Sequence, residues 1–245
     1  MKSEVYNPEV SIILPCLNEA EILEDSVNQI KKVMDKTKYS YEIIISEDGS
    51  TDGTDKIADK LSKKYKNVIH LHSDKRLGRG KGVEKGIKAS KGQVVGFIDA
   101  DLQTSPEDIP KLIDEIFKGY DFVTIRRYYF KKGIGYCFRV IPSISFMFLT
   151  KLFFWNPVYD TAAGCKFFKK DKILPILDKI KDNHWFWDTE ICIISYKEGL
   201  KMKEIPSIFY KREFEERKSK AKVFESSIDY LVKLIKLKIR ILREY

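Results

Sequence analysis

Two aspartates, Asp99 and Asp101, stand one residue apart in the stretch FIDADLQTSPE, directly after a run of apolar residues. Carboxylates are costly to bury unless something pairs with them, so the spacing raises the question of which cation belongs there. At the end of a strand, two carboxylates in the order D-x-D can hold Mg²⁺ or Mn²⁺, and the ion can bridge a diphosphate. Taken alone, the pair also fits ordinary loop acids.

The stretch SEDGSTDGT adds a second polar cluster at residues 46–54. Its two glycines permit tight turns. Its small polar side chains suit the cap of a following helix: Ser50, Thr51, Asp52 and Thr54. A turn and a cap do not explain the two acids ahead of them, Glu47 and Asp48, which we expect to face a cleft.

A third cluster, RLGRGKGVEKG at residues 76–86, is basic and rich in glycine ahead of an expected helix. Such a loop suits a phosphate. Its glycine spacing fits neither a P-loop nor the G-x-G-x-x-G fingerprint, which disfavours an ATPase or an NAD enzyme.

Apolar runs alternate with amphipathic patterns through the first half of the chain. The runs predict strands at 10–16, 41–46, 67–72, 93–99 and 121–125, with helices at 19–34, 54–65 and 82–90. This alternation predicts an α/β fold with a mostly parallel sheet. In such sheets ligands bind at the carboxyl ends of the strands, where the polar stretches PCLNE, SEDGSTDGT and DADLQ fall. The sequence therefore predicts one shared site.

The second half is less regular, with a helix expected near 171–180 and a strand near 201–210. The apolar segment 133–155 is interrupted by Arg139, Pro142 and Lys151, and its uncharged stretches are shorter than the roughly 20 residues of a membrane span. We expect interfacial helices there, or else a covered core hairpin. A basic amphipathic helix is expected at 222–245, with its apolar stripe at Phe224, Ile228, Leu231, Ile235, Ile239 and Leu242. Such a helix would lie on an anionic membrane, or else pack on the domain or on a partner subunit.

Composition sets wider bounds. The 245 residues, 43% hydrophobic, suit one large α/β domain, and the net charge of +9 suggests an anionic partner. Four scattered cysteines without a C-x-x-C pair argue against a cysteine zinc site and suit a reducing cytosol. The histidines His70, His72 and His184 show no ligand spacing, and no nucleic-acid-binding signature accompanies the basic residues.

Four motifs in order resemble family 2 glycosyltransferases with the GT-A fold: VSIILPCLNEAEIL, SEDGSTDGT, RGKGVEKGIKASKG and FIDADLQTSPEDIP. The later DTAAGCKFF, WFWDTEI and EIPSIFY look like the branch that contains dolichyl-phosphate mannose synthases and dolichyl-phosphate glucosyltransferases. The resemblance covers roughly residues 8 to 223. It implies a GT-A catalytic domain at 1–221 followed by the helix at 222–245.

The resemblance also implies roles for single residues. The nucleotide sugar would contact Pro15, Asn18, Glu19, Asp48, Lys81, Asp99, Ala100 and Arg212, with Asp48 facing the base. The metal ion would contact Asp99, Asp101 and Gln103. The acceptor phosphate would contact Arg127, Arg139 and Ser143. Two departures stand out, Cys16 in place of a common aromatic residue and the long charged stretch KREFEERKSKAKV.

The chemistry of the acceptor separates two enzyme hypotheses. A phosphate is ionised at neutral pH and needs cations, for which Arg127, Arg139 and Lys166 are candidates, rather than a strong base. A sugar hydroxyl would need a general base, and Asp188 in FWDTE is the obvious choice. A third hypothesis is a membrane-associated, nucleotide-binding module without catalysis.

The favoured interpretation is an inverting, metal-dependent transferase that uses Mg²⁺ or Mn²⁺. It would move a hexose from a nucleotide sugar, UDP-glucose ahead of GDP-mannose, to a polyprenyl or dolichyl phosphate. The protein would be cytoplasmic and peripheral on the cytoplasmic face of a membrane, with Asp101, Arg127, Arg139 and Asp188 as catalytic candidates and no nucleic acid as partner.

Overall fold

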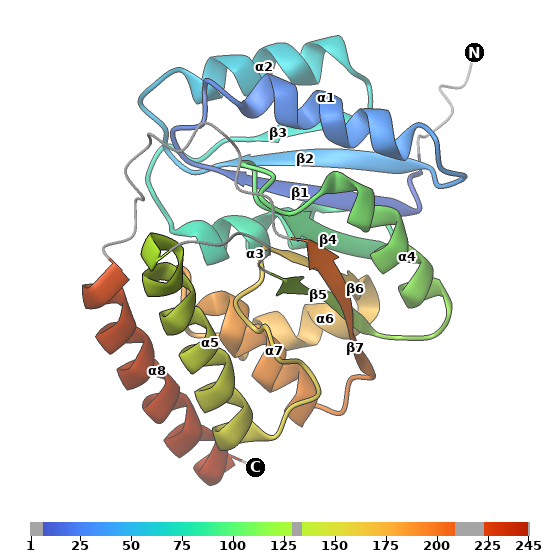
Figure 1. Ribbon diagram of the computed structural model, residues 1–245. Helices are drawn as coiled ribbons and strands as arrows, with labels where there is room; N and C mark the ends of the chain where they lie inside the picture. The colour runs from blue at the N-terminus through green and yellow to red at the C-terminus, as the bar shows by residue number, and fades with distance from the viewer. Residues whose placement is uncertain (1–6, 129–133, 209–222, 245) are drawn as a thin grey trace.

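The computed structural model describes residues 7–128, 134–208 and 223–244, with side chains at 7–128, 144–208 and 228–244. Its centre is a seven-stranded sheet in the order β3-β2-β1-β4-β6-β5-β7 (Figure 1). The strands are β1 (Val10–Cys16), β2 (Tyr41–Glu47), β3 (Val68–Leu71), β4 (Val94–Ile98), β5 (Phe122–Tyr128), β6 (Cys165–Lys169) and β7 (Met202–Ile208). The alternation of strands and helices along the first half of the chain therefore predicted the fold class correctly.

Strand β6 makes the sheet mixed rather than simply parallel. It pairs antiparallel with β4 on one side and with β5 on the other, whereas the other pairs run parallel. The register places Cys165 opposite Ile98. Because β6 runs against β4, its first residues lie beside the end of β4, where Asp99 follows. The segment DTAAGCKFF thus forms one wall of the predicted site.

Eight α-helices lie among the described residues. They are α1 (Leu23–Met34), α2 (Thr54–Lys64), α3 (Arg79–Ala89), α4 (Ile109–Phe117), α5 (Ile134–Phe154), α6 (Lys170–Leu177), α7 (Trp187–Lys197) and α8 (Val223–Glu244), and a short 3₁₀ turn at Pro106–Asp108 precedes α4. Figure 1 shows α1 and α2 on one side of the sheet, with α3, α6 and α7 on the other.

Both faces of the sheet are covered, and the alternation of side chains along each strand divides the core in two. Along β1, Ile12 and Leu14 pack with α1, α2 and α4, while Ile13 packs with α3 and α7. Along β4, Ile98 joins the first cluster and Phe97 the second. Burial on both faces explains why these strands appear in the sequence as continuous apolar runs.

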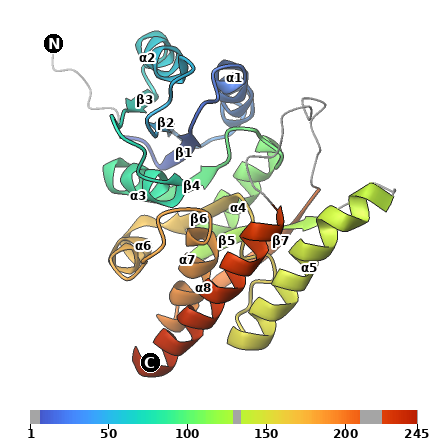
Figure 2. The same cartoon turned by 90° about the vertical axis from the view of Figure 1, so that its left-hand side faces the viewer.

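The apolar segment expected to be interrupted at Pro142 forms one continuous helix, α5 (Ile134–Phe154). Helix α5 lies beside α8 (Figure 2), and the rings of Phe146 and Tyr230 meet edge to face at 5.4 Å. Within the described residues, neither helix is long and apolar enough to cross a membrane.

Helix α8 docks on its own chain with a face that the sequence did not single out. Its buried side chains are Leu234, Leu237 and Ile241. Arg240 reinforces the contact by donating from Nη2 to Oε1 of Glu190 on α7 at 2.6 Å. The predicted apolar stripe is exposed instead: Ile228, Leu231, Ile235, Ile239 and Leu242 are each at least 40% accessible. The predicted stripe is therefore not the face that packs on this chain, and whether it contacts a membrane or a partner subunit stays a prediction.

Candidate functional site

The loops after β1 and β2 are held together by side-chain hydrogen bonds. The N–H of Asn18 donates to Oγ of Ser50 at 2.9 Å, and Oδ1 of Asn18 accepts from the N–H of Thr51 at 2.8 Å. Oγ1 of Thr54 accepts from the N–H of Glu19, also at 2.8 Å. Asn18 has a φ of 54°, and Gly53 rather than a polar residue is the N-cap of α2. The polar residues of SEDGSTDGT thus join two loops. Of the predicted capping residues, Asp52 accepts from the N–H of Thr54, the first residue of α2, at 3.0 Å.

Asp99 follows β4 directly and approaches a glycine of the opposing segment. Its N–H donates to the carbonyl oxygen of Gly164 at 3.0 Å. A Cβ added at Gly164 would lie well inside contact distance of Oδ2 of Asp99. The carboxylate of Asp99 therefore occupies its position because residue 164 has no side chain.

Asp101 lies in the same acidic neighbourhood as Asp99 and Glu19. Burial raises the pKa of Asp101 to about 6, and the negative charges of Asp99 and, less strongly, Glu19 act in the same direction. The N–H of Gln103 donates to Oδ1 of Asp101 at 3.3 Å. In the part of the chain that the structure describes, Asp101 forms no ion pair. Clustered carboxylate oxygens with a high proton affinity are a donor set that fits a hard divalent cation.

Arg79, the first residue of α3, connects Asp99 to the far side of the site. Its Nε donates to Oδ1 of Asp99 at 2.9 Å, and its Nη1 donates to Oδ2 of Asp188 at 2.6 Å. The guanidinium also lies 4.8 Å from the ring centre of Trp185. Burial opposes the charge, but Asp188 and Asp99 raise the pKa of Arg79 above its usual range.

Asp188, at the start of α7, is a buried carboxylate with both oxygens engaged. Oδ2 accepts from Arg79 at 2.6 Å, and Oδ1 lies 3.3 Å from Nζ of Lys166. Burial raises the pKa of Asp188, and the charges of Arg79 and Lys166 counteract this rise. Lys166 is itself fully buried and also donates to the carbonyl oxygen of Ala163. The two predicted site residues therefore meet each other inside the protein.

Asp48 holds the loop ahead of α3. Its Oδ1 accepts from the N–H of Leu77 at 2.6 Å, and its Oδ2 accepts from the N–H of Gly78 at 2.9 Å. Lys81, in the first turn of α3, donates from Nζ to Oε1 of Glu84 at 2.8 Å. The structure thus brings the second and third polar clusters of the sequence into contact. The predicted roles of Asp48 at the base and of Lys81 at a phosphate stay predictions.

Two further predicted nucleotide contacts belong to the same edge of the sheet. Pro15 lies in β1 opposite Ser46 of β2. The carbonyl oxygen of Ala100, between the two aspartates, accepts from Oγ of Ser26 on α1 at 2.6 Å. Helix α1 therefore fixes the backbone from which Asp99 and Asp101 project.

Arg127, near the end of β5, is held by Asp160. Its Nε donates to Oδ2 of Asp160 at 2.6 Å and its Nη2 to Oδ1 at 2.8 Å. The N–H of Asp160 in turn donates to Oε1 of Glu204, whose pKa burial raises to about 7. The other predicted contacts lie outside the residues whose side chains are described: Arg139, Ser143 and Arg212. The acceptor-phosphate assignments therefore stay predictions.

Two important residues were missed by reasoning from the sequence. Arg79 stood inside the basic loop RLGRGKG but was not singled out, although an arginine at the start of a helix near acids is a plausible ion-pair partner. Gly164 stood inside DTAAGCKFF, and only its closeness to Asp99 in space shows why a glycine is needed.

Solved structures of similar fold identify the architecture of the chain. The chain is similar in fold to the solved structure of mannosyl-3-phosphoglycerate synthase from Rubrobacter xylanophilus, with a TM-score of 0.71 and 16% identity over 97% of this chain and 76% of that one. Glucosyl-3-phosphoglycerate synthase from Mycobacterium tuberculosis, solved with Mn²⁺, UDP and phosphoglyceric acid, matches with a TM-score of 0.66 and 18% identity, over 94% of this chain and 78% of that one. The chain has the GT-A fold of these glycosyltransferases.

Sequence comparison narrows the class to a family. The family model described as glycosyl transferase family 2 matches residues 11–176. The chain belongs to this family, as its four ordered motifs predicted.

Two curated relatives are similar over most of this chain. Glycosyltransferase AglD of Haloferax volcanii is 33% identical over 202 residues, which is 81% of this chain and 32% of the relative. Dolichyl-phosphate beta-glucosyltransferase ALG5A of Trichomonas vaginalis is 28% identical over 207 residues, 80% of this chain and 64% of the relative. The chain thus spans between about one third and two thirds of the length of these relatives.

Proposed function

We propose that this protein transfers a hexose from a nucleotide sugar to a polyprenyl phosphate of the dolichyl type. The observation that carries the proposal is the acidic group of Asp99, Asp101 and Glu19 beside the first turn of α3, in a chain similar to a dolichyl-phosphate beta-glucosyltransferase. A further relative is an undecaprenyl-phosphate 4-deoxy-4-formamido-L-arabinose transferase of Aeromonas hydrophila. It is 33% identical over 120 residues, which is 48% of this chain and 37% of the relative.

The site would hold Mg²⁺ or Mn²⁺ through Asp101, with Asp99 and Gln103 as further oxygen ligands. When bound, such an ion neutralises the negative charge that builds on a departing nucleoside diphosphate. Arg79 donates only to Oδ1 of Asp99, and Oδ2 lies on the side of Gly164 with no hydrogen bond to the side chains that the structure describes. The loop bonds of Asn18 and Asp48 would keep the nucleotide pocket in shape before the donor arrives.

The buried charges favour a phosphate acceptor over a sugar hydroxyl. A hydroxyl acceptor needs a general base within hydrogen-bond reach, and the candidate for that base was Asp188. Both oxygens of Asp188 serve Arg79 and Lys166, and its side chain is 3% exposed. We therefore assign Asp188 to the positioning of Arg79 rather than to proton transfer. An ionised phosphate needs no such base.

The exposed apolar side chains of two adjacent helices support a location at a membrane surface. Helix α5 and the residue after it present Ile144, Phe148, Leu152 and Trp155 to solvent, each at least 51% accessible. Helix α8 presents Ile228, Ile239 and Leu242, together with the exposed cations Lys236 and Arg243. Apolar side chains flanked by cations favour an interface with anionic lipid. The membrane in question would be the one that carries the lipid acceptor, contacted at its cytoplasmic face.

The decisive test is a transfer assay. Purified protein is incubated with polyprenyl phosphate, Mg²⁺ and a panel of UDP- and GDP-sugars, and the lipid product is identified by mass spectrometry. We expect a hexosyl phosphate lipid, formed from UDP-glucose in preference to GDP-mannose and abolished by a chelator. Transfer to a sugar hydroxyl but not to the lipid would contradict the proposed acceptor. Tight nucleotide binding without any transfer would indicate a non-catalytic module.

A further inference from the structure

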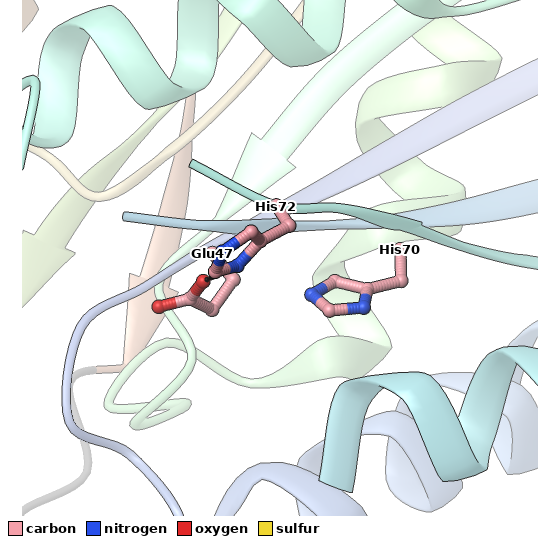
Figure 3. A group of neighbouring side chains, drawn as sticks. All are labelled: Glu47, His70 and His72. Carbon is pink, nitrogen blue, oxygen red and sulfur yellow. Dashed lines mark hydrogen bonds and ion pairs between the residues drawn. The ribbon is translucent and has the colours of Figure 1, made fainter. Parts of the chain in front are cut away.

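A second group of metal-ligand side chains lies at the edge of the sheet, apart from Asp99 and Asp101. Glu47 ends β2, and His70 and His72 come from β3 and the residue after it. The pairing of Ser46 with Leu71 places Glu47 beside His72. One potential ligand atom from each of the three side chains lies within 4.8 Å of the other two. Figure 3 shows the three side chains together, with a ring nitrogen of His70 directed at the other two.

Within this group, His72 has hydrogen-bond partners for both ring nitrogens, whereas one ring nitrogen of His70 has none among the described residues. Nδ1 of His72 lies 2.6 Å from Oε2 of Glu47, and Nε2 of His72 lies 3.3 Å from Oδ1 of Asp74. Nε2 of His70 is buried and has no hydrogen-bond partner within the described part of the chain. Buried polar atoms are rarely left without a partner. An ion pair between Glu47 and His72 accounts for two members of the group but gives no partner to His70.

We propose that Glu47, His70 and His72 bind a divalent transition-metal ion, with Zn²⁺ as the preferred occupant. Two imidazoles and one carboxylate are ligands that Zn²⁺ takes in proteins, and the fourth position of such a site is open to water. Ligand atoms around tetrahedral Zn²⁺ are about 3.4 Å apart, so modest side-chain rotations would close the group around an ion.

The surroundings of His72 fit this role. A histidine that ligates a metal commonly donates its other ring N–H to a carboxylate, which fixes the orientation of the ring. With Nδ1 directed at Glu47, the other nitrogen of His72 is the one that faces Asp74. Asp74 would therefore orient a ligand rather than bind the ion itself.

The position of Glu47 gives the site a structural consequence. Its Oε1 accepts from the N–H of Ser50, the residue whose hydroxyl holds Asn18, and Asp48 follows it directly in the chain. An ion shared with β3 would fix the loop that connects these residues. The site differs in chemistry from the all-oxygen group at Asp101, because imidazole ligands favour Zn²⁺ while carboxylates and amides suit Mg²⁺.

The test uses Co²⁺ as a spectroscopic probe on the full chain. Protein cleared of metal with a chelator is titrated with Co²⁺ in a large excess of Mg²⁺, which occupies the oxygen site. We expect one equivalent to bind with the visible absorption of a four-coordinate ion, and Zn²⁺ to displace it. Zn²⁺ should also raise the midpoint of thermal unfolding, because it binds the folded state.

Variants connect the signal to these side chains. His70→Gln and His72→Gln should each weaken Co²⁺ binding at least tenfold and remove the Zn²⁺-dependent rise in the midpoint. The control His184→Gln alters the exposed histidine outside the group and should bind as the parent does. No Co²⁺ binding in Mg²⁺, or binding that both variants leave unchanged, would overturn the proposal. Loss of binding in Asp101→Asn but not in His70→Gln would assign the ion to the other site and also overturn it.

Discussion

The carboxylate of Asp99 lies where the side chain of residue 164 would otherwise be. Gly164 and Asp99 face each other across β4 and β6, and a Cβ at residue 164 would be well inside contact distance of Oδ2 of Asp99. Their backbones are also joined, since the N–H of Asp99 donates to the carbonyl oxygen of Gly164 at 3.0 Å. The antiparallel strand β6 therefore determines where this acid can be.

Gly164→Ala should displace Asp99 and weaken the proposed metal site. We expect at least a tenfold fall in transfer rate at limiting Mg²⁺ and a loss of stability of about 1–3 kcal/mol from overpacking. Transfer is assayed as a function of Mg²⁺ concentration, and stability by denaturant unfolding. The Asp99→Ala variant provides the control: once the acid is absent, adding Gly164→Ala should lower the rate little further. Equal effects of Gly164→Ala with and without Asp99 would contradict this coupling.

Arg79 should matter for both stability and turnover. Its side chain is 10% exposed and is paired with Asp99 and Asp188. Arg79→Ala leaves Asp188 buried with only Lys166, so we expect a loss of about 3 kcal/mol together with at least a tenfold fall in transfer. Lys63→Ala on α2, which breaks an ion pair between two exposed side chains, is the control and should change stability by less than about 0.5 kcal/mol. Unfolding midpoints that are equal for the two variants would refute the role of Arg79.

The first half of the fold could be predicted from the sequence because local rules were sufficient. The strands β1, β2 and β4 are continuous apolar runs, and the glycines and acids after them mark the ends at which ligands bind. Strand β6 could not be found in this way, since DTAAGCKFF has no alternation and its antiparallel position depends on β4 and β5. The ordered motifs still predicted the family correctly, although no single motif was specific.

The site could be predicted as a set of acids but not as a network. The spacing of Asp99 and Asp101 in the sequence was enough to predict them as site residues. The ion pair of Arg79 with Asp188 could not be predicted in this way, because the two residues are 109 positions apart. The packed face of α8 could not be chosen from the sequence for a related reason. Its sequence contains two apolar stripes, and only the contact with α5 and α7 decides that Leu234, Leu237 and Ile241 are the buried one.

The exposed stripe of α8 should determine binding to lipid. Leu242 is 71% exposed and Phe148 of α5 is 66% exposed. We expect Leu242→Asp and Phe148→Asp each to reduce co-sedimentation with anionic vesicles several-fold while leaving the unfolding midpoint near that of the parent, because neither side chain is packed. Leu237, on the packed face of the same helix, is 4% exposed, and Leu237→Asp should destabilise the fold instead. Vesicle binding that neither exposed substitution changes would remove these helices as the membrane contact.

Without a metal ion, the ionised carboxylate of Asp101 should destabilise the folded protein. With a metal ion bound, the same carboxylate should be needed for transfer. Its pKa is raised to about 6, so the folded protein holds a proton on Asp101 more tightly than the unfolded chain does. The contribution of this carboxyl group to stability is therefore greatest in acid and is lost as the pH rises through 6. In a chelator at pH 8, Asp101→Asn should raise the free energy of unfolding by about 1–2 kcal/mol, and at pH 4 the gain should vanish.

The same substitution should abolish most of the transfer at every pH, and the parent enzyme should lose Mg²⁺ affinity below pH 6 as the carboxylate takes up its proton. The stability of both proteins is measured by unfolding in chelator across pH. The transfer rate and its dependence on Mg²⁺ are measured by titrating the assay with Mg²⁺. The Asp101→Asn substitution keeps the size of the side chain while it removes the charge and replaces one acceptor oxygen with an NH₂ group, so a change in packing does not explain the expected pattern. A fully active Asp101→Asn enzyme, or one whose stability gain is the same at pH 4 and pH 8, would show that this acid is not held for a cation.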